Sequence, residues 1–476
     1  MDMPISIHDL LATAPITIVT VTALLVLILE SVVSKAQALT AWIALSGLVA
    51  AMVGAFTLLE ETGTAFVGMV TTGGYASFFA IVFCLSGVLS IMLSKMYIRN
   101  QGIEQGEYYA LVLFAVIGMM LMAAAADLIV FFLGLELMSI CFYVLAGFAR
   151  SRAASNEAAL KYFLLGAFAT GFLLYGIALV YGSTGTTNIH LIIQDAETAM
   201  ESTVFLIGLG LLVVGLGFKI AGVPFHMWVP DVYEGSPTTV SGFMSTGGKA
   251  AAFSALLLIF APKMMNTVDA LRDVLAAVAT LSMIVGNVLA ISQNNVKRML
   301  AYSSIAHAGY ILVGVVAANE AGANGVLFYL LAYTVMNVGA FGILSVGESR
   351  EGEYLSFDDY TGLSTRRPLL AGLMALYMFS LAGIPPFAGF FGKYYVFAGA
   401  IEAGYTWLAV IGVLMSAVSA YYYLRLVVLM YFKEGVSAME APVPALSLVA
   451  LVISAIGILG FGILPSVVLK LTEQIF

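Results

Sequence analysis

A glutamate and four lysines lie inside long apolar segments of this sequence, where charged side chains are rare. They are Glu136, Lys161, Lys219, Lys249 and Lys393. A lysine at the centre of a membrane costs roughly 2.5–3.5 kcal/mol, so ionisable residues in such positions usually have a function. Burial and a nearby carboxylate change the proton affinity of a lysine in opposite directions, so movement of the carboxylate loads or unloads a proton. The set therefore predicts proton transfer along the middle of a membrane.

Glu136 is the most central carboxylate, since it lies well inside its apolar segment, about 13 Å from the segment's start. We expect it to form an ion pair with Lys219, which adjoins a helix break. Lys161 lies closer to a segment end, from which a long side chain extends to the membrane surface. The alternative is a set of static salt bridges that only orient helices. One glutamate is poor compensation for three central lysines in such an arrangement.

Two similar proline-containing motifs interrupt apolar segments beside Lys219 and Lys393. They are Ala-Gly-Val-Pro-Phe at 221–225 and Ala-Gly-Ile-Pro-Pro-Phe at 382–387. Because proline has no N–H, carbonyls of the preceding helical turn lose their partners and become available to cations or water. The carbonyls expected to be released are those of Ile220 at the first motif and of Leu381 and Ala382 at the second. The two segments cross the membrane in opposite directions, which is typical of an inverted repeat.

The histidines are weaker candidates. His226 and His307 are proton relays near neutral pH or, alternatively, hydrogen-bonded packing residues. Cys84 and Cys141 lie in apolar runs, which indicates neither a disulfide framework nor a metal site. The glycine-rich run at 208–218 lacks the spacing of a nucleotide-binding loop, so we interpret it as helix packing.

Composition sets the fold class. Hydrophobic residues make up 62% of the 476 residues and charged residues only 10%, whereas soluble domains have about 25% charged residues. The mean hydropathy is +1.04. These values exclude a soluble enzyme, a disordered protein and a nucleic-acid-binding protein.

We predict an all-α polytopic membrane protein, because the apolar runs are continuous rather than alternating as in a barrel. The fourteen expected spans are 13–33, 39–59, 75–96, 108–125, 127–148, 158–182, 203–228, 239–260, 271–292, 301–318, 324–347, 368–399, 405–432 and 442–470. Spans seven and twelve are the broken ones. The expected units are 1–105 with helices 1–3, 106–260 as a first five-helix repeat, 268–432 as its inverted copy, and 442–476 with helix 14.

Basic residues in the connecting segments divide unequally between the two sides of the membrane. Only Lys263, Arg272 and Lys470 fall on one side. The other side receives Lys35, Lys95, Arg99, Arg150, Arg152, Lys297, Arg298, Arg350, Arg366, Arg367, Arg425 and Lys433. Because basic loops remain in the cytoplasm, both termini and the loop 183–202 are predicted outside it. We expect a multi-pass protein of a prokaryotic inner (plasma) membrane, with the loop 348–367 as a solvated cytoplasmic connection.

Three motifs are specific enough to suggest a family. They are Lys-Ile-Ala-Gly-Val-Pro-Phe-His-Met-Trp-Val-Pro-Asp-Val-Tyr-Glu-Gly-Ser-Pro-Thr-Thr at 219–239, Asn-Asn-Val-Lys-Arg-Met-Leu-Ala-Tyr-Ser-Ser-Ile-Ala-His at 294–307 and Gly-Ile-Pro-Pro-Phe-Ala-Gly-Phe-Phe-Gly-Lys at 383–393. They resemble the antiporter-like membrane subunits of respiratory complex I, and the similarity covers nearly the whole chain. The segment 233–237, the lysine at 393 and the absence of a long lateral helix resemble the subunit N group of NADH-quinone oxidoreductase.

The resemblance implies fourteen spans, two inverted five-helix units and proton translocation coupled to quinone reduction elsewhere in the complex. It implies a role in that translocation for Glu136, Lys161, Lys219, Lys249 and Lys393. The subunit would itself bind no NADH, flavin, iron–sulfur cluster, quinone or metal. Its partners would be other membrane subunits of complex I and the lipid bilayer, with no nucleic acid. It would contribute to an H⁺-translocating NADH:quinone oxidoreductase as a non-redox subunit.

Two other functions fit the same features. A subunit of a multi-subunit cation/proton antiporter would share the fold and the buried lysines, and sodium-dependent transport would favour it. A purely structural membrane scaffold is the third interpretation, and unchanged pumping after loss of Lys219 would favour it.

Overall fold

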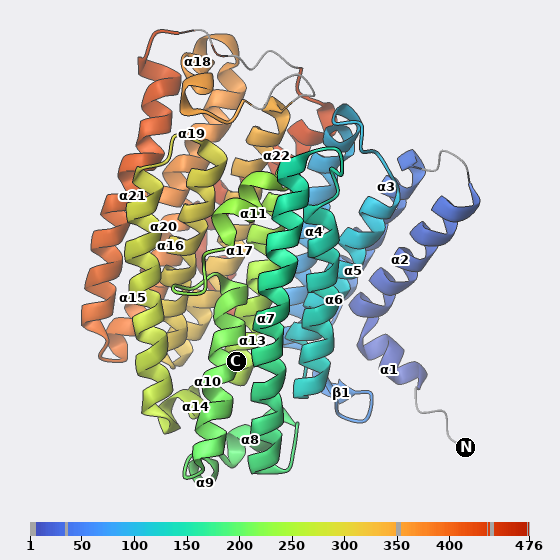
Figure 1. The fold of residues 1–476 in the computed structure, drawn as a ribbon, viewed down its shortest axis with the longest axis vertical. Coiled ribbons are helices and arrows are strands. Elements are labelled where there is room, and N and C mark those ends of the chain that lie inside the picture. The colour runs from blue at the N-terminus through green and yellow to red at the C-terminus, as the bar shows by residue number, and fades with distance from the viewer. Residues whose placement is uncertain are drawn as a thin grey trace.

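The computed structural model is a bundle of long helices that run between the same two ends of the molecule (Figure 1). Within the described residues, twelve helices are long and apolar enough to cross a membrane, which confirms the predicted polytopic helical fold. The described residues are 6–33, 37–348, 354–435, 437, 442–473 and 475.

The first part of the chain packs at one edge of the bundle, where α3 lies between α2 and α4. The backbone N–H of Phe66 donates to the Asp9 carboxylate at 3.0 Å, which joins the first helix to a β-hairpin that the sequence did not predict. The elements are α1 (Ile7–Ala12), α2 (Ala14–Val32), α3 (Gln37–Thr57), β1 (Thr62–Ala65), β2 (Val70–Gly73) and α4 (Gly74–Asn100).

The middle of the chain corresponds to the expected first repeat. Its helices are α5 (Glu107–Ala123), α6 (Leu128–Ala146), α7 (Ala153–Thr184), α8 (Ile189–Gln194), α9 (Ala196–Ala199), α10 (Thr203–Ile220), α11 (Val229–Gly235), α12 (Thr238–Phe243), the π-helix η1 (Met244–Gly248) and α13 (Lys249–Ile259). The last three follow one another directly and form one span, Thr238–Ile259.

The remaining helices correspond to the expected second repeat and the last span. They are α14 (Pro262–Thr267), α15 (Asp269–Ile291), α16 (Val296–Ala317), α17 (Glu320–Gly347), the 3₁₀ helix η2 (Phe357–Tyr360), α18 (Leu363–Arg366), α19 (Pro368–Ala382), α20 (Ala388–Glu402), α21 (Thr406–Phe432), α22 (Ala445–Ile463) and α23 (Pro465–Glu473). Among the described helices, α16 and α17 are the most enclosed of the long spans of this part, with 94% and 100% of their apolar windows buried. They therefore form its core.

Two of the fourteen expected spans correspond to shorter apolar helices. These are α5 and α19, and the latter continues as α20 after an interruption. The total of fourteen spans, the inverted repeats and the unit boundaries given above stay predictions.

Both expected helix interruptions are present and are alike in geometry. After α10, Ala221 adopts a left-handed conformation with φ 63°, and after α19, Gly383 does so with φ 87°. In each case the N–H of that residue donates to carbonyls of the preceding turn, which is a common way to end a helix. This likeness supports the predicted inverted repeat.

The two ends of the bundle carry different connections. Figure 1 shows α1, α8 and α9 at one end and α18 at the opposite end, as the predicted topology requires. Lys35 and Arg350, two of the basic residues used for that prediction, lie outside the described residues.

The loop 348–367 is not simply solvated, and this prediction was wrong for its described part. Leu355, Phe357, Tyr360 and Leu363 are buried against the bundle. The backbone of Leu355 also accepts a hydrogen bond from Val296 at the start of α16. The error arose because the apolar side chains are spaced among many charged residues, which lower the mean hydropathy of the segment.

Candidate functional site

Lys219 lies in the last turn of α10, and only 7% of it is exposed. Its ammonium donates to the Ser139 hydroxyl at 2.7 Å and lies 3.5 Å from the Tyr143 hydroxyl. The rings of Tyr143, Tyr162 and Phe218 lie within 6.0 Å of the same nitrogen. Ring faces and the carbonyl end of a helix both favour a cation, so this site accommodates a charged lysine without a direct carboxylate.

Glu136 lies on α6, one turn before Ser139, and is half-buried. Its Oε1 accepts a hydrogen bond of 2.9 Å from the Thr170 hydroxyl of α7. Within the described residues, Glu136 and Lys219 form no ion pair at 4.0 Å or less, so the expected direct pair is not formed in this structure. Ser139, which shares a helix face with Glu136, accepts the hydrogen bond of the Lys219 ammonium instead.

Lys161 belongs to a partly exposed charge network near the start of α7. Its ammonium lies 2.6 Å from Glu157 and 2.9 Å from Asp231, and its side chain is 42% exposed, as expected for a residue near a segment end. Arg298 also contacts Asp231, at 2.9 Å, and Glu234, at 2.5 Å. Partial burial alone would raise the pKa of Asp231, but hydrogen bonds from Lys161 and Arg298 outweigh this and lower that pKa below its usual value.

Lys249 is the first residue of α13 and follows the π-helix directly. It is only 2% exposed, and its ammonium donates to the backbone carbonyl of Ser304 on α16. A π-turn shifts the following residues around the helix and is frequent at functional sites. This turn was not predicted from the sequence, in which the adjacent Gly247 and Gly248 are the one sign of an irregular helix.

His307 lies on α16, one turn beyond Ser304, and both of its ring nitrogens contact tyrosine hydroxyls. The distances are 2.8 Å from Nδ1 to Tyr329 and 3.1 Å from Nε2 to Tyr423. The geometry is compatible with either expected role, relay or packing, and places His307 between the two lysines.

Lys393 lies in α20, beyond the second helix break, and is 4% exposed. Its ammonium donates to the carbonyls of Leu381 and Ala382 at 3.1 and 3.0 Å, and to the Ser416 hydroxyl at 2.8 Å. These are the two carbonyls that the prolines were expected to release. The ring of Tyr310 lies 4.8 Å from the same nitrogen.

One face of α16 connects the two lysines. Ser304, His307 and Tyr310 lie on three successive turns, and the contacts of Lys249 and Lys393 fall at the two ends of this row. Six residues along a helix correspond to a rise of about 9 Å. In the part of the chain that the structure describes, neither lysine has a carboxylate within 4.0 Å.

His226 does not join this row. It lies half-buried in the turn between α10 and α11, and its Nδ1 is buried without a hydrogen-bond partner among the described residues. Cys84 and Cys141 are buried and unpaired, at 0% and 4% exposure. Across the described ranges, no group of three or more histidine, cysteine, aspartate or glutamate side chains is arranged to hold a metal ion.

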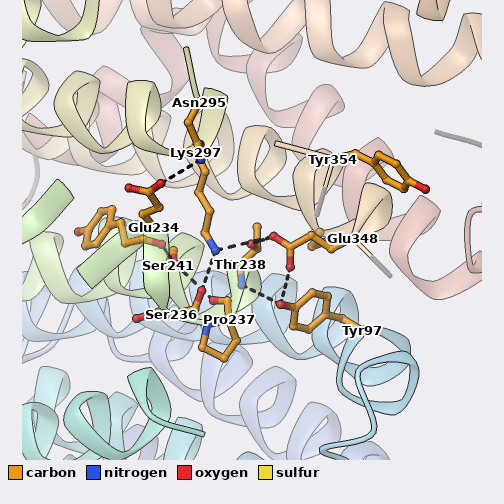
Figure 2. Close-up of polar contacts among 12 residues, drawn as sticks. Tyr97, Glu234, Ser236, Pro237, Thr238, Ser241, Asn295, Lys297, Glu348 and Tyr354 are labelled. Atoms are coloured by element: carbon orange, nitrogen blue, oxygen red, sulfur yellow. Dashed lines mark hydrogen bonds and ion pairs between the residues drawn. The ribbon is translucent and has the colours of Figure 1, made fainter. Parts of the chain in front are cut away.

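A buried ion pair between Lys297 and Glu348 was missed. Both side chains have 0% exposure, and their charged atoms are 3.7 Å apart. Figure 2 shows the Lys297 ammonium directed between Glu348 and the carbonyl of Ser236, to which it donates at 2.7 Å. The sequence predicts a loop at Lys297, because the two adjacent basic residues Lys297 and Arg298 depress the local hydropathy. The available signal was Asn295, which caps α16 and shows that the helix begins at Val296.

Comparison with known proteins adds independent information. Residues 125–419 match the family described as NADH:quinone oxidoreductase/Mrp antiporter, TM. NADH-quinone oxidoreductase subunit N of Trichlorobacter lovleyi is 49% identical over 457 residues, which cover 94% of this chain and 93% of that protein. A chain of respiratory complex I from Thermus thermophilus has a TM-score of 0.83 and 36% identity, with 96% and 98% of the two chains covered. A chain of the Mrp complex from Dietzia sp. DQ12-45-1b has a TM-score of 0.86 over 98% and 97% of the chains, but its 22% identity shows a shared fold alone.

Proposed function

Because this chain belongs to the subunit N family of NADH-quinone oxidoreductase, we propose that it moves protons across the membrane through its buried lysines. The chain is an antiporter-like membrane subunit, and its structural relatives include a chain of respiratory complex I, which contains other membrane subunits. NADH, flavin, iron–sulfur clusters and quinone are bound by those other subunits, and this chain takes no part in electron transfer.

The observation that carries the proposal is the set of partners around Lys249 and Lys393. Backbone carbonyls and one hydroxyl bind the two ammonium groups. A lysine kept only for structure would be paired with a carboxylate, because an uncompensated buried charge costs several kcal/mol. A lysine with neutral partners gives up its proton without separating from a counter-charge, and this property suits a proton carrier.

The route runs from Glu136 and Lys219 to Lys249, and along α16 to Lys393. Glu136 gives its proton as a carboxylic acid to the neutral amine of Lys219 and becomes a carboxylate. Each lysine ammonium then gives one proton to the next neutral group and becomes a neutral amine. His307, with hydroxyls on both ring nitrogens, relays the proton between Lys249 and Lys393. Lys161 lies near the entrance to this route, in the charge network beside α11.

The exit lies beside Lys393. A cavity of about 570 Å³ is lined by Lys393, Ser416 and Glu402, the last residue of α20, together with mostly apolar and aromatic side chains of α20 and α21. Glu402 is about 13 Å further along the helix than Lys393, so the cavity extends from the lysine towards the end of α20. We propose that this end faces away from the cytoplasm, in a prokaryotic inner membrane with both termini outside.

Replacement of Lys249 tests the function. In the complete complex, Lys249→Met should reduce proton pumping about a hundredfold or more, which is the usual effect of losing an acid–base group. Lys433→Met, at an exposed position after α21, is the control and should pump normally. Pumping is measured in membrane vesicles, and assembly is checked by native gel. Normal pumping by an assembled Lys249→Met complex would refute the proposal, and sodium-dependent transport would favour the cation/proton antiporter function.

A further inference from the structure

The Lys297–Glu348 pair has no place in the proton route described above, although it is the most completely buried ion pair of the described residues. Both side chains are inaccessible to solvent. Lys297 has a carboxylate among its partners, which distinguishes it from Lys249 and Lys393. A buried pair of this kind is weak evidence for stability but is well suited to fixing the relative position of helices.

Four helical elements meet at this pair. Glu348, directly after α17, accepts a hydrogen bond of 2.6 Å from the Tyr97 hydroxyl of α4 and a second one from the Thr238 hydroxyl of α12. The Tyr97 hydroxyl in turn accepts the backbone N–H of Thr238 at 3.1 Å. Lys297, on α16, donates to the carbonyl of Ser236 between α11 and α12. Figure 2 shows these side chains converging on the start of α12.

Two of these elements, the span that begins with α12 and the helix α16, meet again at Lys249. Thr238 is the first residue of the span Thr238–Ile259, which carries Lys249, and Lys297 is on the helix that carries Ser304, the acceptor of Lys249. The two contact points are separated by about 16 Å along the first helix and about 10 Å along the second. Contact at the helix start therefore fixes the register in which Lys249 meets α16.

We propose that Lys297 and Glu348 are positioning residues for proton transfer through Lys249. This inference rests on the proposed function, because it assigns the pair a role in that route. The carboxylate also lies at the N-terminal end of the helix that carries Lys249, where negative charge is favoured. Loss of one partner leaves the other charge buried and unpaired, so the helix start must move and Lys249 is displaced from α16.

Four variants in the complete complex test the proposal. Glu348→Gln and Lys297→Met each remove one charge, and each should reduce pumping several-fold in an assembled complex. The double variant should pump at least as fast as the single variant with the lower pumping rate, because the two residues act as one unit. Lys297→Arg retains a fixed positive charge and should pump within about twofold of the unmodified complex, because a positioning residue does not need to release a proton.

Several outcomes would overturn the inference. Normal pumping by Glu348→Gln, or single losses that multiply in the double variant, would show that the pair does not act as proposed. A loss in Lys297→Arg as large as in Lys297→Met would show that Lys297 itself carries protons. If Glu348→Gln does not assemble, Tyr97→Phe, which removes one hydroxyl and no charge, takes its place, and normal pumping by that variant counts against the proposal. Failure of the proposed function has a different signature, which is normal pumping by Lys249→Met.

Discussion

The lysines discussed above differ in the chemical groups that their ammonium groups contact. Lys161 and Lys297 contact carboxylates, whereas Lys249 and Lys393 contact carbonyls and a hydroxyl. Lys219 is intermediate, with hydroxyls and ring faces around it. A carboxylate fixes a positive charge, while a neutral partner permits its removal. Under the proposed function, the partner distinguishes the lysines that hold helices in position from those that transfer protons.

Lys393→Arg separates a fixed charge from a proton carrier. Arginine keeps the positive charge but does not release a proton at physiological pH. We expect the variant complex to assemble and its rate of proton pumping in vesicles to fall about a hundredfold or more. Lys393→Met should fail similarly. An arginine variant that assembles and pumps normally would mean that Lys393 is a fixed charge and that the exit uses other groups.

The network around Asp231 predicts a dependence of stability on pH. Lys161 and Arg298 lower the pKa of Asp231 below 3.8 in the folded protein. A group with a lowered folded pKa contributes stability above the unfolded value, and this contribution is lost as the pH falls through the folded value. The difference in thermal midpoint between the unmodified protein and Asp231→Asn should therefore be constant near neutral pH and shrink below about pH 4.

Asp273→Asn is the matched control for this measurement. Asp273 is exposed at the start of α15 and has no contact with the network. The variant should have the same midpoint as the unmodified protein throughout the range. A difference for Asp231→Asn that stays constant into acid would show that its carboxylate is not held by Lys161 and Arg298.

At residue scale, the sequence predicts burial for lysines inside long apolar segments but not what they contact, and it does not predict the burial of Lys297. A charged residue inside a long apolar segment is visible locally, so Lys219, Lys249 and Lys393 could be identified. Their partners could not, because Ser304 is 55 positions from Lys249 and Ser139 is 80 positions from Lys219. Glu348 was missed for the same reason, since its partner Lys297 lies in another helix.

The second helix break is the element that holds Lys393. Gly383 has φ 87°, and a Cβ at this position would lie 3.1 Å from Cδ and 3.2 Å from Nζ of Lys393. Gly383→Ala therefore adds backbone strain of roughly 1–2 kcal/mol and also displaces the lysine from the carbonyls of Leu381 and Ala382. We expect an assembled complex with clearly reduced proton pumping, measured in vesicles.

Gly404→Ala is a close control because it separates strain from displacement. Gly404 has φ 83°, but a Cβ there would meet nothing within 4 Å. Its replacement should cost similar stability, roughly 1–2 kcal/mol, and leave pumping unchanged. Equal effects of the two substitutions on pumping would mean that strain alone, and not the position of Lys393, accounts for the loss.

Elements were predicted well where one residue type dictates the backbone. Proline removes a donor wherever it stands, so both interruptions and the carbonyls released at the second were predictable. The π-helix before Lys249 was not predictable, because its residues also fit a regular α-helix. Contacts of its side chains with other helices select the π form. Ser245 binds Asn337 of α17, and Thr246 contacts Ser86 of α4.

At the scale of the whole molecule, α16 and α17 form the centre to which the functional features attach. Lys249 contacts α16 from the first unit, and Lys393 lies over a ring of α16 from the second unit. Glu348 and Lys297 connect the ends of these two helices to α12. A displacement of α16 relative to α12 would thus change the surroundings of both lysines together, which would link the two halves of the proposed route.

The predicted topology requires the two ends of the bundle to face different compartments. Figure 1 places α9 and α18 at opposite ends, and Thr198 and Thr365 are exposed at these elements. We expect Thr198→Cys to react with an impermeant thiol reagent from outside the cell, and Thr365→Cys to react only in inverted membrane vesicles. The native cysteines give no background, because Cys84 and Cys141 are buried. Basic residues concentrate at the connections on the α18 side, and such residues are retained in the cytoplasm. Labelling of both positions from one side would contradict the alternation of the spans, whereas the exchanged pattern would preserve the fold and reverse the proposed direction of proton exit.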